Sequence, residues 1–511
     1  MQKIKKYLTP NNIFLIIILL IATFLRFYNL PNNYMFMGDQ GRDALVVANI
    51  FKEKDPVFIG PVTSIGNMYL GPFYYYFMLP FLFISYPNPI GPVYAVAALS
   101  VITVALVYLI SKKMFNNKIA IFATIFFALS STNINLARFS WNPNPAPFFS
   151  LLMFYFTYLA WKKDGRYWLL VSAMFSILAQ LHYVTLLSLA GAGIIFLIDL
   201  KKKISQKNSK QLIKFGLLSV VIFLLSLTPL LLFDLKHDWR NINALKNIVV
   251  KEESFKLERK EGRQGINAIA KLFTHDLRKQ GKTVLFDSLL GESKINYWLM
   301  YISLAFFLYY IFTNRDKLKK ADKVLFAYLF TGIAGLSLYQ HDIYTHYFAY
   351  LLPMVAIFQA YLLDKIKIKK LSYLVSGAFL LVFIVNNLKL YNFANSGWGV
   401  NEMRTVAKSI HDRVADGEKY NIVLLSESKD LYGMNYRYFL STMANPPVKI
   451  EDHHQAEKLF IINEEKKEED LLDLNIYEIA VFPEKNILEK YQLDQGPEIS
   501  VLGKVENNYN E

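Results

Sequence analysis

The chain has 511 residues, of which 54% are hydrophobic and 15% aromatic, and its 56 Lys and Arg outnumber its 41 Asp and Glu by 15. Charged residues make up 19%, below the roughly 25% usual in soluble proteins, and long apolar runs recur, which excludes a soluble globular enzyme and indicates a multi-pass membrane protein. The absence of cysteine excludes disulfides, iron–sulfur clusters and thiol nucleophiles.

Eleven apolar segments predict membrane-spanning helices, so we expect an all-α polytopic domain over residues 1–390. Every second connection between them is basic, as in Lys112, Lys113 and Lys118, and the others are not. By the positive-inside rule, the N-terminus is expected in the cytoplasm and the protein in the plasma membrane. The excess positive charge is then explained by topology, and we expect no nucleic-acid partner. The expected spans are residues 12–27, 91–111, 118–133, 146–161, 167–181, 183–200, 212–233, 296–313, 323–340, 346–363 and 371–388.

The first outer loop, residues 28–90, contains the motif "MFMGDQGRDA". Asp39, Arg42 and Asp43 stand in it, and Gly38 and Gly41 are expected to loosen the backbone around the first aspartate. A bland alternative for Asp43 is that it caps a helix or pairs with Arg42. Later in this loop, residues 71–85 are apolar, but a span there would break the alternation of basic loops. We therefore expect a helix on the outer surface.

Two later segments also carry polar groups toward the outer side. The two legs of residues 167–200 are short for a bilayer, so their turn, with Gln180 and His182, is expected to lie below the surface and to face a cavity open to the outside. A large outer loop follows at residues 234–295.

The tail, residues 391–511, has ordinary soluble composition and predicts a small extracytoplasmic α/β domain. Its stretch "NEMRTVAKSIHDRVA" has helical periodicity, and "YNIVLLS", "LFIIN" and "YEIAVF" are typical of short strands.

The polar residues of the outer connections form one candidate site. Its catalytic candidates are Asp39 and Asp43, because a carboxylate can take the proton of a hydroxyl as general base. The other members could hold an anionic phosphate leaving group and its substrate. These are Arg42, Arg138, His182, Lys236, His237, His346 and Tyr347, with Trp141, Gln180, Tyr183, Asp234, His341 and Asp342 nearby in the sequence.

The order of one span, an acidic first outer loop, an aromatic surface helix and then "VYAVAALSVITVALVYLISKKMFNNKIAIFATIFFALSS" resembles the GT-C superfamily of membrane glycosyltransferases. The nearest branch is that of protein O-mannosyltransferases and lipid A aminoarabinose transferases. The resemblance implies a hexosyltransferase that uses a polyprenyl-phosphate sugar on the extracytoplasmic face, with Asp39 as the base. Relatives often have a second acidic residue where this chain has Gln40. It implies no certain cofactor and leaves a divalent metal open.

The competing interpretation is a polytopic transporter or lipid flippase without transferase activity. Such a protein should show repeat symmetry and interrupted spans near the midplane, and we find neither pattern in the sequence. A third interpretation, a surface receptor anchored by the membrane part, would need far fewer spans. The sugar and the acceptor, whether protein, lipid glycan or cell-wall polymer, are left open.

Overall fold

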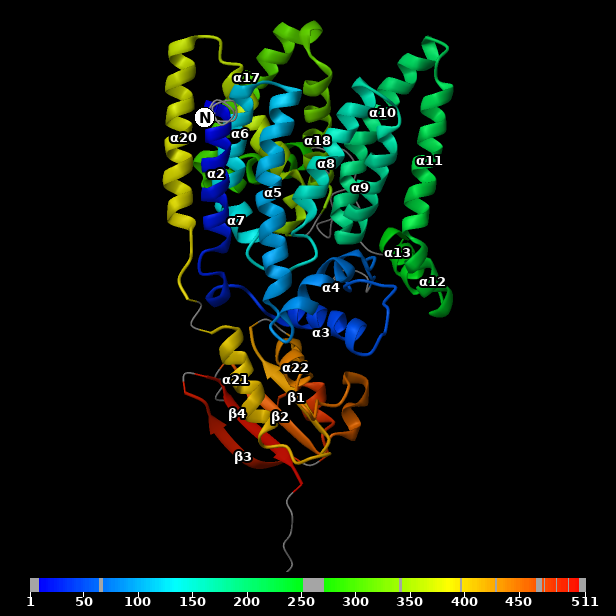
Figure 1. Ribbon diagram of the computed structural model, residues 1–511, viewed down its shortest axis with the longest axis vertical. Helices are drawn as coiled ribbons and strands as arrows, with labels where there is room; N and C mark the ends of the chain where they lie inside the picture. The colour runs from blue at the N-terminus through cyan, green and yellow to red at the C-terminus, as the bar shows by residue number, and fades with distance from the viewer. Residues whose placement is uncertain are drawn as a thin grey trace, which may run out of the picture.

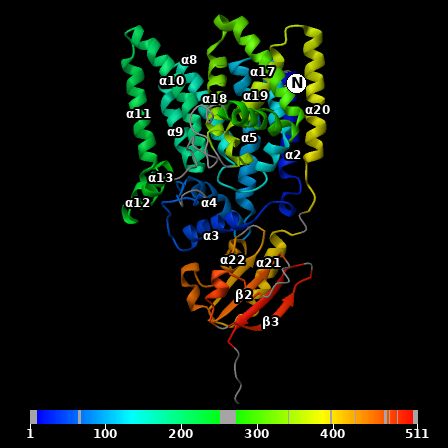
Figure 2. The same cartoon turned by 180° about the vertical axis from the view of Figure 1, so that it is seen from behind.

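The computed structural model describes residues 9–63, 68–250, 271–339, 342–395, 398–427, 430–465, 471–472, 474–483, 485–494 and 496–504. Long, roughly parallel helices form a bundle, and α3 (Gly38–Lys52) and α4 (Phe73–Ser85) lie across one end of it (Figure 1). The C-terminal domain lies beyond α3, on the side away from the bundle, as the view from behind also shows (Figure 2).

Helices occupy all eleven expected spans. The bundle consists of α2 (Pro10–Phe27), α5 (Ile90–Met114), α6 (Asn117–Leu129), α7 (Ser131–Leu136), α8 (Ala146–Lys162), α9 (Tyr167–Leu181), η2 (Tyr183–Leu187), α10 (Ser188–Ser205), α11 (Lys210–Ser226), α12 (Thr228–Lys236), α17 (Ile295–Asn314), α18 (Lys320–Ser337), η7 (Thr345–Tyr347), η8 (Ala349–Leu351), α19 (Leu352–Asp364) and α20 (Lys369–Leu390). The connections α10–α11 and α19–α20 lie at the end away from α3 and α4 (Figure 1), which agrees with the alternation of basic loops.

Local chemistry explains several helix ends. Thr9 accepts the backbone N–H of Asn12 and Pro10 occupies the first turn, so α2 begins there. The expected span 212–233 is corrected in one respect, because it bends by 45° between α11 and α12. Pro229 stands in the first turn of α12 and cannot donate to the hydrogen-bond ladder of α11.

Five helices of the described residues are long and apolar enough to cross a membrane alone, or six if the bent pair α11–α12 counts as one span. Shorter apolar helices, including α6 and α9, fill other expected spans. The structure therefore confirms a polytopic helical architecture, and the count of eleven spans stays a prediction.

The expected helix at residues 71–85 is confirmed as α4. Tyr74 and Tyr75 are buried on its inner side, whereas Phe83 and Ile84 are exposed. Further short helices of the described chain lie outside the bundle's long members. They are η1 (Leu30–Asn32), α13 (Arg240–Val250), η4 (Leu272–Asp276), α15 (Leu277–Lys282), η5 (Thr283–Asp287), α16 (Ser288–Leu290) and η6 (Arg315–Lys317).

The expected outer loop 234–295 is not wholly a surface loop, which corrects the sequence prediction. Residues 283–290 are mostly buried against α19 and α20: Gln359 donates to the carbonyl of Leu285 over 2.7 Å, and Asn387 donates to that of Leu289 over 2.6 Å. Residues 251–270 of this loop lie outside the described residues.

The C-terminal domain is an α/β fold with a four-stranded sheet in the order β1-β2-β4-β3. Strands β1 and β2 are parallel, and the other two pairs are antiparallel. Its elements are α21 (Val400–His411), β1 (Tyr420–Leu425), α22 (Met434–Leu440), η9 (Ile450–Gln455), β2 (Lys458–Asn463), α23 (Tyr477–Ala480), β3 (Asn486–Gln492) and β4 (Glu498–Gly503).

Three of the four elements expected in the tail are confirmed as α21, β1 and β2. The strand expected at "YEIAVF" is wrong, because its first four residues form α23. Ile479 and Phe482, three residues apart, are both buried in the cluster that contains Val423 and Leu459 on one side of the sheet. That spacing suits a helical turn, and a short apolar run does not distinguish the two structures.

Candidate functional site

The acidic motif forms the first turn of α3. The helix begins at Gly38, after the extended residue Met37, whose backbone N–H donates to Oε1 of Gln40 over 2.9 Å. Spacings of three and four residues put Asp39, Arg42 and Asp43 side by side on the helix surface. A carboxylate in the first turn also complements the partial positive charge of the helix N-terminus.

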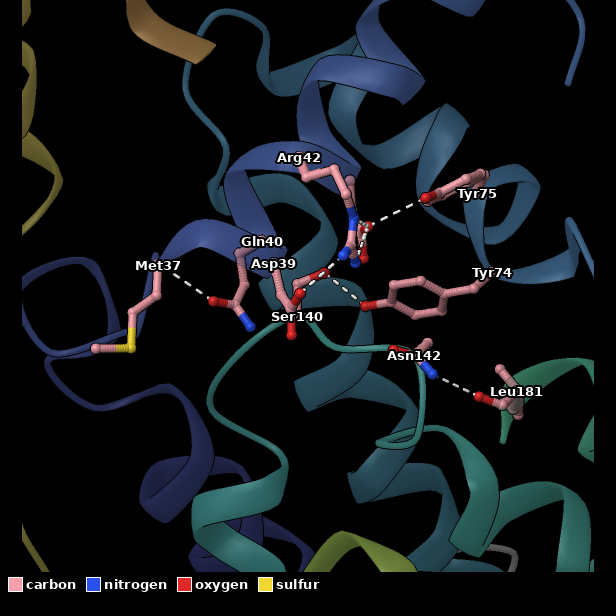
Figure 3. Close-up of polar contacts among 10 residues, drawn as sticks. Met37, Asp39, Gln40, Arg42, Tyr74, Tyr75, Ser140, Asn142 and Leu181 are labelled. Atoms are coloured by element: carbon pink, nitrogen blue, oxygen red, sulfur yellow. Dashed lines mark hydrogen bonds and ion pairs between the residues drawn. The ribbon is translucent and has the colours of Figure 1, made fainter. Parts of the chain in front are cut away.

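Arg42 joins the two carboxylates. Its Nη1 donates to Oδ1 of Asp39 over 2.8 Å, and its Nη2 and Nε donate to Oδ1 of Asp43 over 2.8 and 3.0 Å (Figure 3). The side chain of Asp39 is 48% exposed, whereas that of Asp43 is 2% exposed. The motif thus presents one accessible carboxylate, backed by a buried ion pair.

Asp43 lies in a buried environment. Tyr75 donates to its Oδ1 over 3.2 Å, and its Oδ2 is buried without a hydrogen-bond partner in the described part of the chain. Burial raises the pKa of Asp43 to about 6, although the neighbouring Arg42 acts in the opposite direction. The alternative that Asp43 pairs with Arg42 is therefore what the structure shows.

A chain of contacts leads from this motif to the turn after α9. Tyr74, next to Tyr75 on α4, shares a 2.6 Å hydrogen bond with Ser140. Asn142, two residues further on, donates to the carbonyl of Leu181 (Figure 3). Segments distant in sequence therefore meet here, as the sequence predicts for the outer connections.

Beside these contacts lies a ring cluster, which we define as Trp141, His182, His346 and Tyr347. The ring centroids of Trp141 and His346 are 4.4 Å apart. The ring centroid of His182 lies 5.5 Å from that of His346 and 5.2 Å from that of Tyr347. Three of the sequence-predicted site residues are thus in mutual contact.

The two histidines of the ring cluster are partly buried. Burial lowers the pKa of His182 to about 3, with a further contribution from His346. Nδ1 of His182 accepts the backbone N–H of Val184 over 3.3 Å, so the proton of the neutral ring is on Nε2. The neutral ring of His182 can serve as a hydrogen-bonding group.

Arg138 is engaged elsewhere. Its guanidinium donates to the carbonyls of Leu25, Arg26 and Tyr28 at the end of α2 and to the side chain of Asn33, over 3.0–3.3 Å. A cation at this position complements the partial negative charge of a helix C-terminus. Within the described residues, the hydrogen bonds of Arg138 go to the end of α2 and to Asn33, and not to the acidic motif.

Lys236 is the last residue of α12 and His237 follows it, and both are exposed. Nδ1 of His237 donates to the carbonyl of Phe233 over 2.8 Å, and the two rings stack at 4.0 Å. Asp234 accepts two backbone N–H groups, from Asn241 and Ile242, and holds the turn into α13. In the described part of the chain, the hydrogen bonds and ring contacts of Asp234 and His237 are local, and His341 lies outside that part.

Sequence reasoning misses two members of this region. Tyr75 is expected only as an interface residue, yet it binds Asp43. Asp430 of the C-terminal domain lies against Gly38, and nothing in the local sequence around either residue signals that contact.

The contacts of Arg42 also decide whether the acidic motif could bind a divalent metal. Arg42 bridges Asp39 and Asp43, so its positive charge occupies the position between the carboxylates that a cation would need. In the described residues no three His, Asp or Glu side chains group together as metal ligands. The acidic motif as it stands does not fit a metal.

Comparisons with known proteins agree on the architecture. A family model described as dolichyl-phosphate-mannose-protein mannosyltransferase matches residues 71–231. ArnT from Cupriavidus metallidurans in the apo state superposes with a TM-score of 0.57 at 11% identity, over 96% of this chain and 97% of that one. The chain has the GT-C fold.

Two further solved structures share the GT-C fold. ArnT bound to undecaprenyl phosphate gives a TM-score of 0.56 at 11% identity, with 96% of this chain and 97% of that one covered. The Archaeoglobus fulgidus oligosaccharyltransferase in complex with Zn and sulfate gives 0.50 at 12% identity, over 88% of this chain and 68% of that one. A search of curated protein sequences finds no match.

The GT-C fold extends over nearly the whole chain, so the C-terminal domain belongs to the shared architecture. The family match is shorter. It begins just before α4 and ends in α12, so it contains Tyr75, Trp141 and His182 but not the acidic motif of α3.

Proposed function

We propose that this protein is a membrane glycosyltransferase. It moves a hexosyl group from a polyprenyl-phosphate donor to a hydroxyl of the acceptor, on the extracytoplasmic face where α3 and α4 lie. The observation that carries the proposal is the half-exposed Asp39 in the first turn of α3, in a chain with the GT-C fold. Arg42 pairs with Asp39 and also with the buried Asp43. A solved structure with this fold binds undecaprenyl phosphate, which supports the donor class.

In the proposed reaction, Asp39 takes the proton of the acceptor hydroxyl while that oxygen attacks the anomeric carbon of the donor sugar. The bond between the anomeric carbon and the phosphate oxygen breaks, and the polyprenyl phosphate leaves with its electron pair. Attack from the face opposite the phosphate inverts the anomeric configuration. Because the phosphate is already a competent leaving group, the reaction needs one base and positive charge near the phosphate.

Arg42 is the cation nearest the proposed base, and Lys236 and His237 remain predicted contributors to phosphate binding. The ring cluster suits a different task. His182 and His346 can exchange hydrogen bonds with sugar hydroxyls, and Trp141 offers an apolar ring face. We therefore assign them to the sugar rather than to the phosphate.

The test is to incubate the purified protein with a panel of polyprenyl-phosphate hexoses and candidate acceptors and to identify products by mass spectrometry. The expected result is consumption of one donor, with a product of inverted configuration by NMR and at least about a hundredfold slower product formation by Asp39→Asn. Translocation of lipid across vesicles without any transfer would instead support the transporter interpretation.

A further inference from the structure

The first turn of α3 lies in very close contact with the C-terminal domain. A Cβ atom added at Gly41 would come within 2.5 Å of the Cα of Asn435 and of the carbonyl carbon of Met434. A Cβ added at Gly38 would lie 2.6 Å from Cγ and 2.8 Å from Cβ of Asp430. Real Cβ atoms do not approach other atoms so closely, so both glycines are required for this approach of α3 to α22.

A hydrogen bond within the C-terminal domain holds Asp430 in its place against Gly38. Asp430 accepts the backbone N–H of Met434, the first residue of α22, over 2.8 Å, so turning its side chain away from Gly38 would break that hydrogen bond. Burial raises the pKa of Asp430, and the negative charge of Asp39 raises it further, which places the two carboxylates in the same electrostatic environment.

Other interactions hold α3 and the residues before it to α22. The ring of Phe36 lies 5.6 Å from those of both Tyr438 and Phe439. At the other end of α3, Lys52 donates to the carbonyl of Ser441 over 3.2 Å. One hydrophobic core runs without interruption from the bundle to α21, α22 and the near side of the sheet. Figure 1 shows α22 next to α3, between it and the sheet.

We infer that the C-terminal domain is a positioning element of the active site, which sets the place of Asp39 through the contact of Gly41 with α22 and of Gly38 with Asp430, which precedes α22. We call this contact the glycine seam. Gly38 and Gly41 are one helical turn apart, and Asp39 and Arg42 each directly follow one of them. A Cβ on the seam must push the first turn of α3 away from α22 and carry Asp39 and Arg42 with it. The inference rests on the proposed function.

The prediction separates turnover from binding, because the ring cluster and the membrane helices do not take part in the seam. Gly41→Ala should lower kcat at least tenfold while the Kd for the polyprenyl-phosphate sugar stays within about threefold, since a displacement near 1 Å can cost about a hundredfold in rate. Gly377→Ala is the matched control, because a Cβ at that helical glycine meets nothing within 4 Å.

A second pair of variants distinguishes displacement of α3 from misfolding of the protein. The three atoms nearest to a Cβ at Gly38 all belong to the side chain of Asp430, whereas those nearest to a Cβ at Gly41 are backbone atoms. Gly38→Ala should therefore lose kcat tenfold or more, and adding Asp430→Gly should restore it to within about threefold of the Asp430→Gly single variant. The same addition should not restore Gly41→Ala.

The full-length protein is measured in detergent or nanodiscs, with the wild type as reference. Because the chain has no cysteine, Glu53→Cys and Thr405→Cys provide two unique spin-label positions, one at the end of α3 and one on α21. Gly41→Ala should displace or broaden the interspin distance. Wild-type turnover in Gly41→Ala, a Kd that weakens in step with kcat, or no rescue of Gly38→Ala would overturn the inference. An inactive wild type would instead contradict the proposed function.

Discussion

Arg42 donates from Nη1 to Oδ1 of Asp39 over 2.8 Å. The same guanidinium is bound on its other side to the buried Asp43, so it cannot follow Asp39 freely. This arrangement fixes the exposed carboxylate by means of a buried one. The planar guanidinium is the feature that permits it, since it can donate in two directions at once.

Arg42→Lys should lower turnover about ten- to a hundredfold even though the charge is kept. A lysine ammonium is a point donor and cannot bridge both carboxylates, and a hydrogen bond to a charged group is worth about 1.5–3 kcal/mol. Arg166→Lys is the control, because Arg166 is exposed and pairs with Asp164 in the connection between α8 and α9. Steady-state kinetics with equal turnover in Arg42→Lys and wild type would show that the bridge is not needed.

The pH dependence of turnover should report on Asp43. Its pKa is raised to about 6 by burial, so below that pH it becomes neutral and ceases to hold Arg42. Arg42 then acts on Asp39 alone and makes it a weaker base. Turnover of the wild type should fall below about pH 6, and Asp43→Asn should lack that inflection. An identical acid limb in both proteins would assign it to another group.

Thermal stability provides an independent check on Asp43. Its folded pKa lies above the value of about 3.9 for an unfolded Asp, so the folded chain binds more protons between about pH 4 and 6. The contribution of Asp43 to the free energy of unfolding is therefore greatest at low pH and declines as the pH rises to about 6. Relative to Asp43→Asn, the wild type should lose Tm from pH 4.5 to pH 7. A constant difference would mean that Asp43 titrates normally.

Arg138→Ala should reduce stability rather than donor affinity. The change removes the donor of the carbonyls at the end of α2. Each buried carbonyl left without a hydrogen bond lowers the free energy of unfolding by about 1–3 kcal/mol. A lower Tm with an unchanged donor Kd is expected, and Arg166→Ala serves as the exposed control. A donor Kd weakened ten- to a hundredfold at unchanged Tm would establish the phosphate role that the sequence predicts.

The topology can be tested with reporters that are active only in the cytoplasm. Fusions at positions 115, 206 and 316 should be active, because basic residues flank these connections. Fusions at positions 87, 238 and 504 should be silent. Activity at position 504 would place the C-terminal domain, and with it the seam, in the cytoplasm.

The sequence predicts the helices well because a membrane solvent requires long apolar segments, and hydropathy detects them directly. It also distinguishes α4 from a span, since the basic loops constrain the count. It does not predict the bend at Pro229, where one apolar run contains two helices. Nor does it predict the burial of residues 283–290, whose polar partners lie on α19 and α20, far along the chain.

At the site, sequence analysis identifies residue types but not their environments. Asp39 and Asp43 are equivalent in the sequence and differ in the structure through burial. His182 and His346 are far apart in the sequence, and only the structure shows that their rings lie 5.5 Å from each other. Gly38 and Gly41 are expected to loosen the backbone, yet both are helical and permit close packing against a domain about 400 residues away in the sequence. Such long-range contacts leave no local pattern.

The most direct test of the account is the kinetics of Asp39→Asn on the purified enzyme. Asparagine keeps the shape of the side chain and can still accept a hydrogen bond from Arg42, but it cannot take a proton. Base catalysis is typically worth about 10²–10⁴-fold, so kcat should fall at least about a hundredfold while donor binding by calorimetry is retained. An Asp39→Asn enzyme that turns over at nearly the wild-type rate would contradict the central claim.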